Sequence, residues 1–400
     1  MRHFKLNLIW QILIGIAVGI GVGMFAPEWF GRLASTFNGI FSQFLGFMIP
    51  LIIIGFVVPA IADVGVRAGK LLVATAVLAY FFTFFAGMLS YFTGVMTFPS
   101  LISGEPGLVS VEDESHLAPY FTMDIPAIMP VMSALVLSFL FGLGIAFMKG
   151  TTLKNFFCEL RDIVQMAIRG VIIPLLPFYI FSIFVVMTVE GQVGVILTTF
   201  IKIIAIIFCL HIFILVLQYC IAACFMRKNP FKMLLTMLPA YLTALGTQSS
   251  AATIPVTLRQ TIKMGVSEDV AGFVVPLCAT IHMSGSALKI TACALALIIM
   301  NGQPYSLSEF LQFTAMLGVT IVAAPGIPGG SIMASLGLLA SVLGFDQQMI
   351  ALMIALYIAM DSFGTACNVT GDGAISAILN PFFTSRQSRL HDRSEAGMTA

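Results

Sequence analysis

The sequence predicts an all-α polytopic membrane protein, and three observations lead to this fold class. Hydrophobic residues make up 59% of the 400 residues and charged residues only 9%, whereas charged residues are about a quarter of a soluble globular domain. Apolar runs of membrane length recur along the whole chain. Two of these runs are interrupted by glycine, serine and proline. A net charge of +1 also leaves no basic surplus for a nucleic-acid partner.

The apolar runs are joined by connections whose charges predict sidedness. Their approximate bounds are 8–26, 39–62, 71–97, 128–148, 170–189, 195–225, 233–258, 270–300, 310–344 and 349–383. The first run is too long for a signal-peptide core. Because Lys and Arg are enriched in cytoplasmic loops, Lys154 and Arg161 predict an inner loop, and the acidic connection 98–127 is assigned to the outside. We expect both termini, including the polar tail 384–400, to be cytoplasmic in the cell inner (plasma) membrane.

Two runs break the alternation of sides. The run 233–258 has basic residues at both flanks and Gly246–Pro255 in its middle, whereas the run 310–344 has no Lys or Arg at either flank and Pro325–Ser331 in its middle. Irregular backbone at membrane depth is tolerated only where it is buried or lines a cavity. Two such segments, one with both flanks on the predicted inner side and one with both on the predicted outer side, predict re-entrant helical hairpins. They also predict the inverted repeats of a secondary transporter. A kinked span or an interfacial loop is the alternative for each segment.

A polar stripe lies in the last apolar run. Asp361, Thr365, Asn368 and Asp372 are spaced so that a helix places them on one face, over roughly 16 Å at 1.5 Å per residue. A carboxylate inside a bilayer is costly, so the stripe is expected to face the protein interior or a wet cavity on a solute path. Two buried acids satisfied by neighbouring helices are the alternative. In the run 270–300, the Gly/Ser-rich segment 278–286 is expected to unwind.

Four segments together resemble the signature elements of the dicarboxylate/amino acid:cation symporter family, which has the glutamate-transporter fold. They are Thr247–Pro255, His282–Ser286, Ile327–Ser331 and Asp361–Asp372. The resemblance extends over essentially the whole chain, nearest the neutral amino acid (serine/threonine) branch. It implies eight transmembrane helices, two re-entrant hairpins and a homotrimer in the lipid bilayer.

The same resemblance divides the chain into a scaffold and a mobile transport domain. The implied parts are 1–70 (scaffold spans 1 and 2), 71–97 (span 3 of the transport domain), 98–190 (scaffold spans 4 and 5 with the outer loop), 191–383 (the rest of the transport domain) and 384–400 (the tail). An elevator-like movement of the transport domain would carry the solute across the membrane.

The resemblance also implies roles for individual residues. Asp361 would bind the substrate amino group, Asn368 and Thr365 would lie at the carboxylate region, and Ser250 with the tip backbone would hold the substrate carboxylate. The implied substrate-binding residues are Gln248, Ser249, Ser250, Ile327, Gly329, Asp361, Gly364, Thr365 and Asn368. The implied sodium ligands are Asp372, Asn368, Cys278, Thr280, Met283 and His282, and the ion-coupling residues are Lys289, His282, Tyr80 and Thr83.

Departures from the family pattern bear on the substrate and on the ions. Gly364 stands where members that carry acidic amino acids have an arginine, so a second substrate carboxylate has no bidentate partner and would face Asp361. The segment around His282 lacks the Asn and Asp of the third cation site. We hypothesise that Lys289, paired with Asp372 or Asp361, stands in for a bound cation. Fewer sodium ions, or a proton exchanged through His282, would then drive transport.

These observations predict a sodium-coupled symporter of a small neutral amino acid, with no cofactor and no enzymatic activity. A symporter of dicarboxylates or acidic amino acids, with proton coupling, is the first alternative, and a channel is a more remote one. An intramembrane aspartyl protease is excluded because its two carboxylates must nearly touch, whereas Asp361 and Asp372 are three turns apart on one helix.

Overall fold

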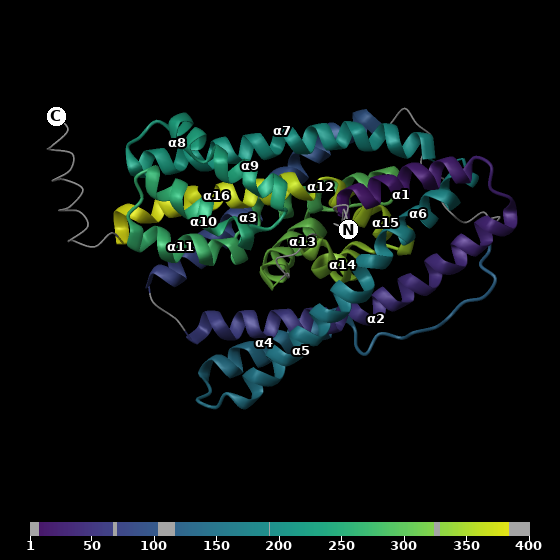
Figure 1. Cartoon of the computed structure of the whole chain (residues 1–400), viewed down its shortest axis with the longest axis horizontal. Coiled ribbons are helices and arrows are strands. Elements are labelled where there is room, and N and C mark those ends of the chain that lie inside the picture. Colours follow the sequence, from purple (N-terminus) through teal and green to yellow (C-terminus); the bar gives the residue numbers. More distant parts are fainter. Residues whose placement is uncertain (1–7, 67–69, 103–116, 192, 324–328, 384–400) are drawn as a thin grey trace, which may run out of the picture.

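The computed structural model describes residues 8–66, 70–102, 117–191, 193–323 and 329–383, and this part of the chain is helical throughout apart from connecting turns (Figure 1). Most of the acidic connection, the tail 384–400 and Ile327 lie outside the described residues. The elements are α1 (Leu8–Gly23), α2 (Glu28–Val66), α3 (Lys70–Ile102), α4 (Val131–Phe147), α5 (Thr152–Ala167), η1 (Ile168–Ile172), α6 (Ile173–Val189), α7 (Val193–Met226), α8 (Pro230–Thr236), α9 (Leu238–Thr247), α10 (Ser250–Lys263), α11 (Glu268–Ile281), α12 (Ser284–Met300), α13 (Leu307–Thr320), η2 (Ile321–Ala323), α14 (Gly330–Leu343), α15 (Gln347–Ala359) and α16 (Asp361–Phe383).

Several of these helices have the length and composition of membrane spans. Among the described residues, five helical stretches pass this test, and α15 with α16 forms a sixth that is bent by 61°. Apolar helices α1, α4 and α14 are shorter. The prediction of an all-α, multi-pass membrane protein is thus confirmed in its coarse form. The exact number of eight spans stays a prediction.

Two predicted helix boundaries are wrong. The run expected at 39–62 begins at Glu28, because α2 extends from Glu28 to Val66. The helix expected at 170–189 begins at Thr152, because α5, η1 and α6 form one continuous stretch of 38 residues. Lys154 and Arg161, which the charge pattern placed in an inner loop, therefore lie within a helix. The short π-helical segment η1 carries the helix through Gly170 instead of ending it, as π-turns insert into α-helices without breaking them. Lys and Arg bias concerns sidedness and does not locate helix ends.

The helices pack in two groups. α2 packs against α4, α5 and α6, and α1 packs along α6. In the other group α3 lies along α12, and α16 is surrounded by α7, α9, α10, α11 and α12. Figure 1 shows α4, α5 and α2 along one side of the molecule, with α16 and its neighbours on the other. The polar stripe of α16, from Asp361 to Asp372, thus lies inside a helical bundle.

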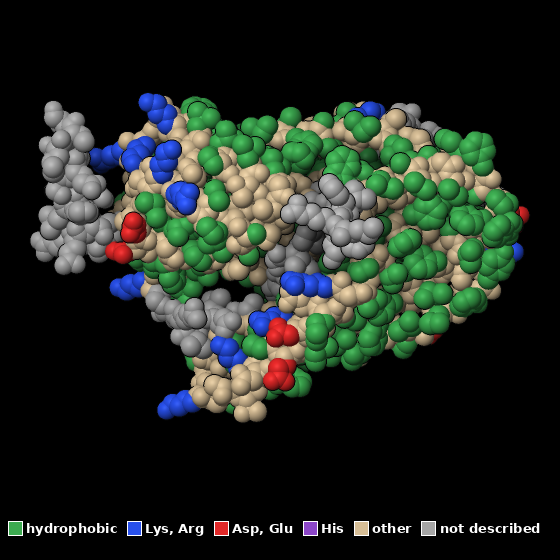
Figure 2. Space-filling view, in the orientation of Figure 1, with side chains coloured by type: hydrophobic (Ala, Val, Ile, Leu, Met, Phe, Trp, Pro, Cys, Tyr) green, Lys and Arg blue, Asp and Glu red, His purple; other side chains and the backbone are tan. Residues whose placement is uncertain are grey.

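Both interrupted segments form helical hairpins. α9 and α10 pack on each other and are joined by Gln248 and Ser249 alone, where Gln248 adopts a left-handed φ of 54° and Ser249 caps α10. At the end of the hairpin opposite the Gln248–Ser249 tip, Lys228 Nζ donates to the carbonyl of Met264 at 2.8 Å. The two flanks of this hairpin therefore meet at one end of the molecule, as their shared basic charge predicted. Figure 2 shows Lys and Arg gathered at this end, near α8 and α10.

The second hairpin consists of α13 and α14, which pack on each other. A capping box of Ser306 and Glu309 begins α13. α14 begins after Gly329, whose φ of 76° favours glycine. Residues 324–328 between the two helices lie outside the described part of the chain. Whether either hairpin is re-entrant in a bilayer stays a prediction.

Candidate functional site

Four helix breaks supply the backbone groups of the candidate site. They separate α9 from α10, α11 from α12, α13–η2 from α14, and α15 from α16. The helices that follow the breaks begin, in the same order, at Ser250, Ser284, Gly330 and Asp361. The first turn of a helix has free amides that favour anions, and the last turn of the helix before it has free carbonyls that favour cations. The break at 282–283 confirms the unwinding predicted there, whereas the bend at Met360 was not predicted.

The polar stripe of α16 faces the protein interior, as predicted. Asp361, Thr365, Asn368 and Asp372 are all buried. The bend at Met360 makes Asp361 the first residue of α16, so its carboxylate lies at a helix N-terminus, where negative charge is favoured. The two carboxylates do not meet, because they are three turns apart on α16, and each contacts a different side chain, Lys289 of α12 or His282 at the α11–α12 break.

Asp361 pairs with Lys289. The distance from Lys289 Nζ to Asp361 Oδ1 is 2.9 Å, and Nζ also lies 3.5 Å from the centre of the Tyr357 ring. The other carboxylate oxygen, Oδ2, accepts a hydrogen bond of 2.7 Å from the Gly329 amide at the start of α14. Lys289 is fully buried. Helices α12, α14 and α16 thus converge on one carboxylate.

Gly364 provides the space for this lysine. A Cβ built on Gly364 would lie 2.8 Å from both Cε and Nζ of Lys289, closer than a side chain tolerates. A Cβ on Gly285 would meet the Gly364 carbonyl oxygen at 2.6 Å. The two glycines therefore let α12 and α16 approach closely, as small residues do in membrane bundles. The end of the Lys289 side chain, from the neighbouring helix, therefore lies beside Gly364.

Asn368 ties α16 to the start of α12. Its Oδ1 accepts hydrogen bonds from the amides of Gly285 at 2.7 Å and Ser286 at 3.3 Å, so it caps α12 from another helix. Its Nδ2 donates to Ser286 Oγ at 3.0 Å and to the Met283 thioether at 3.4 Å. The side-chain amide is thus fully engaged in holding the break together.

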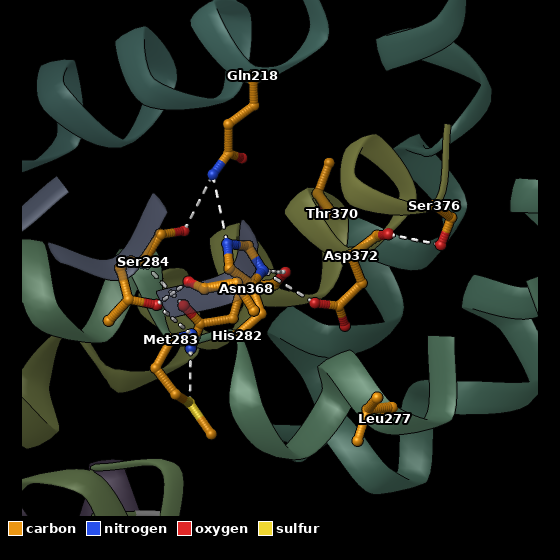
Figure 3. A network of polar contacts seen from close by, with 12 residues as sticks. Gln218, Leu277, His282, Met283, Ser284, Asn368, Thr370, Asp372 and Ser376 are labelled. Atoms are coloured by element: carbon orange, nitrogen blue, oxygen red, sulfur yellow. Dashed lines mark hydrogen bonds and ion pairs between the residues drawn. The ribbon is translucent and has the colours of Figure 1, made fainter. Parts of the chain in front are cut away.

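Asp372 pairs with His282 (Figure 3). The distance from Asp372 Oδ1 to His282 Nδ1 is 3.0 Å, and the carbonyl of Asn368 lies 3.2 Å from the same nitrogen. On the other side of the ring, Gln218 Nε2 approaches His282 Nε2 at 3.3 Å and Ser284 Oγ at 3.4 Å. Both nitrogens of the ring thus have hydrogen-bond partners. The imidazole therefore occupies the surroundings of Asp372 and the Asn368 carbonyl, which were predicted to receive a sodium ion.

The remaining predicted cation residues lie around the same break. Thr83 on α3 accepts from the Met283 amide at 3.1 Å, and Tyr80 donates to the Ala315 carbonyl of α13 at 3.0 Å. The carbonyl of Cys278 accepts from the His282 amide at 2.8 Å, and the exposed Thr280 donates its hydroxyl proton to Leu277. Among the described residues, no three His, Cys, Asp or Glu side chains cluster as a metal site. The Cys278 carbonyl and the Met283 thioether each accept a hydrogen bond in this structure, from His282 and Asn368.

The two helices of the first hairpin, α9 and α10, pack against α16. Ser250 begins α10 as a buried residue. Gln248 is buried too, and within the described part of the chain its side-chain carbonyl has no hydrogen-bond partner. The Ser249 side chain accepts from the Ala252 amide at 3.3 Å. This tip therefore offers an unpaired acceptor and the amides of a helix N-terminus.

A comparison with known proteins identifies the family. The sequence model of the sodium:dicarboxylate symporter family matches residues 8–382. The chain belongs to this family. It is therefore a transporter and not an enzyme, and its family couples dicarboxylate or amino acid symport to sodium. This agrees with the resemblance inferred from the four segments, but it does not select the serine/threonine branch.

Two residues of the network were missed by the sequence analysis. Gln218 contacts His282 and Ser284, and Tyr219 donates to the Thr370 carbonyl at 2.8 Å. Both lie in α7, which is otherwise strongly apolar. A buried amide in the middle of a long apolar helix is costly unless it has a partner. Gln218, as a polar residue inside the apolar run 195–225, was the feature of the sequence that could have predicted a buried polar contact in α7.

Proposed function

We propose that the protein is a sodium-coupled symporter of a small neutral amino acid such as serine, threonine or alanine. The substrate ammonium binds Asp361 at the start of α16, and the substrate carboxylate binds the amides at the start of α10. Helix N-termini favour anions, and a carboxylate favours an ammonium. The positive ammonium of the substrate thus meets a carboxylate of α16, and its negative carboxylate meets the amides of α10.

The contacts of Asp361 support this assignment. Its Oδ2 accepts from the Gly329 amide in the present structure, and a carboxylate offers about four acceptor positions. A substrate ammonium can replace the neutral amide at Oδ2 while Lys289 keeps Oδ1. The stronger, charge-assisted bond then replaces a neutral one.

The observation that carries the choice of a neutral substrate is the Lys289–Asp361 pair. Lys289 fills the space beside Gly364, and its charge is already compensated at 2.9 Å. A second substrate carboxylate would find no unpaired cation there and would face Asp361 instead. The cost of an uncompensated buried charge disfavours a dicarboxylate.

The proposed ion coupling uses fewer sodium ions than the full family pattern offers. His282 occupies the surroundings of Asp372, and Lys289 provides a fixed cation. The carbonyl groups and the Met283 thioether at the α11–α12 break then form the sodium site that remains.

The proposed movement follows the two packing groups. Helices α1, α2, α4, α5 and α6 would form a scaffold, and α3 with α7–α16 would form the transport domain that carries the site across the membrane. The separate packing of α2 with α4, α5 and α6 and of α3 with α12 supports this division. We also propose a homotrimer in the cell inner membrane, with cytoplasmic termini.

Equilibrium binding to the purified protein tests the substrate. Serine, threonine, alanine, aspartate and succinate would be titrated with sodium and with choline. We expect sodium-dependent binding of the neutral amino acids and at least about tenfold weaker binding of succinate, equivalent to 1.4 kcal/mol. Succinate or aspartate binding more tightly than alanine would instead support the dicarboxylate or acidic amino acid alternative.

A further inference from the structure

The Lys289–Asp361 pair has a consequence for the unloaded carrier. Asp361 is 4% exposed and Lys289 is 0% exposed. Among the described residues, Lys289 is the basic side chain in ion-pair contact with this carboxylate. Without it, the substrate-free site would hold a buried negative charge. Removing one partner of a buried pair typically disfavours the remaining charge by a factor of about 100 or more.

We propose that Lys289 is a tethered counter-cation that allows the empty transport domain to return across the membrane, so that the protein performs net uptake and not obligatory exchange. This proposal rests on the proposed function. In the empty carrier the ammonium neutralises Asp361. In the loaded carrier the same carboxylate lies between Lys289 and the substrate ammonium. Both forms therefore cross the membrane without an uncompensated charge on Asp361.

The surroundings of the ammonium hold it in place. The face of the Tyr357 ring lies 3.5 Å from Nζ, and cations are attracted to aromatic faces. The three atoms nearest to a Cβ built on Gly364 all belong to the end of the lysine side chain. A mobile cation would have to bind and dissociate in each cycle, whereas the lysine travels with the site. The carrier therefore needs no counter-transported alkali ion for its return.

The Lys289→Met variant separates return from loaded transport. In proteoliposomes, net uptake of the neutral amino acid requires return of the empty carrier, whereas exchange against the same amino acid inside requires only loaded forms. We expect the ratio of net uptake to exchange to fall about 100-fold relative to the wild type. The substrate ammonium compensates Asp361 in the loaded variant, so exchange is affected less than net uptake, and measurable binding in sodium shows that the variant is folded. Lys202→Met, which alters an exposed lysine on α7, is the matched control and should change neither rate.

A second measurement uses the wild-type protein and does not depend on a folded variant. Net uptake should persist when choline replaces all alkali ions inside the vesicles. Net uptake that stops in choline, or a Lys289→Met variant with an unchanged ratio of uptake to exchange, would overturn the counter-cation. If the wild type neither binds nor exchanges neutral amino acids in sodium, the proposed function itself is wrong.

Discussion

Replacing Gly364 by alanine tests whether Lys289 fills the space in α16. The new Cβ would lie 2.8 Å from Lys289 Cε and Nζ and 3.2 Å from Cδ, whereas carbon atoms pack best at about 3.5–4.0 Å. Because Lys289 is fully buried, its side chain has no exit to water, and the ammonium must shift away from Asp361 or the helices must separate. Overpacking of this kind costs about 1–3 kcal/mol in the free energy of unfolding.

A double-mutant cycle assigns this cost to the lysine. Unfolding by SDS in mixed micelles would be measured for the wild type, Gly364→Ala, Lys289→Ala and the double variant. If the clash is with Lys289, the alanine at 364 costs little once the lysine is truncated, and the coupling energy is about 1–3 kcal/mol. Gly272→Ala is the control, because a Cβ at this exposed position of α11 meets no atom within 4 Å. An equal cost of Gly364→Ala in both backgrounds would refute the reasoning.

Three further predictions concern the network and the hairpin. Asn368→Ala leaves two buried amides of α12 without a partner and should lower the free energy of unfolding by about 2–4 kcal/mol; an unchanged unfolding midpoint would contradict the capping role. Tyr219→Phe removes a single buried hydrogen bond to Thr370 and should cost about 0.5–1.5 kcal/mol with substrate binding retained; loss of binding in a folded variant would show that Tyr219 contacts the substrate. Cysteines replacing Lys228 and Met264 should cross-link with a short bifunctional reagent; no cross-link would mean that the flanks of the first hairpin lie apart.

The sequence predicted the breaks at Gln248–Ser249 and at His282, and the polar stripe, because a bilayer leaves few alternatives. Polar groups in an apolar run must be buried, and irregular backbone must be enclosed by protein. The buried stripe from Asp361 to Asp372 and the break at His282 follow from this rule. The tip at Gln248–Ser249 follows as well, because glycine and serine interrupt the run there.

The pairing of acids with bases could not be predicted in the same way. Periodicity places Lys289 on a face of α12 but does not say which face meets α16, and the lysine was open to either carboxylate. The close approach at Gly285 and Gly364 decides the pairing of Lys289 with Asp361. Lys289 and Asp361 are 72 positions apart in the sequence. The 61° bend at Met360 likewise has no glycine or proline at the break that would signal it in the sequence.

Uptake of labelled serine and succinate into proteoliposomes under an inward sodium gradient tests the central claim most directly, with the wild type compared with Asp361→Asn. The carboxylate of Asp361 is proposed to bind the substrate ammonium, so we expect serine uptake that requires sodium in the wild type and is lost in the variant. Succinate uptake by the wild type that survives in Asp361→Asn would contradict the account.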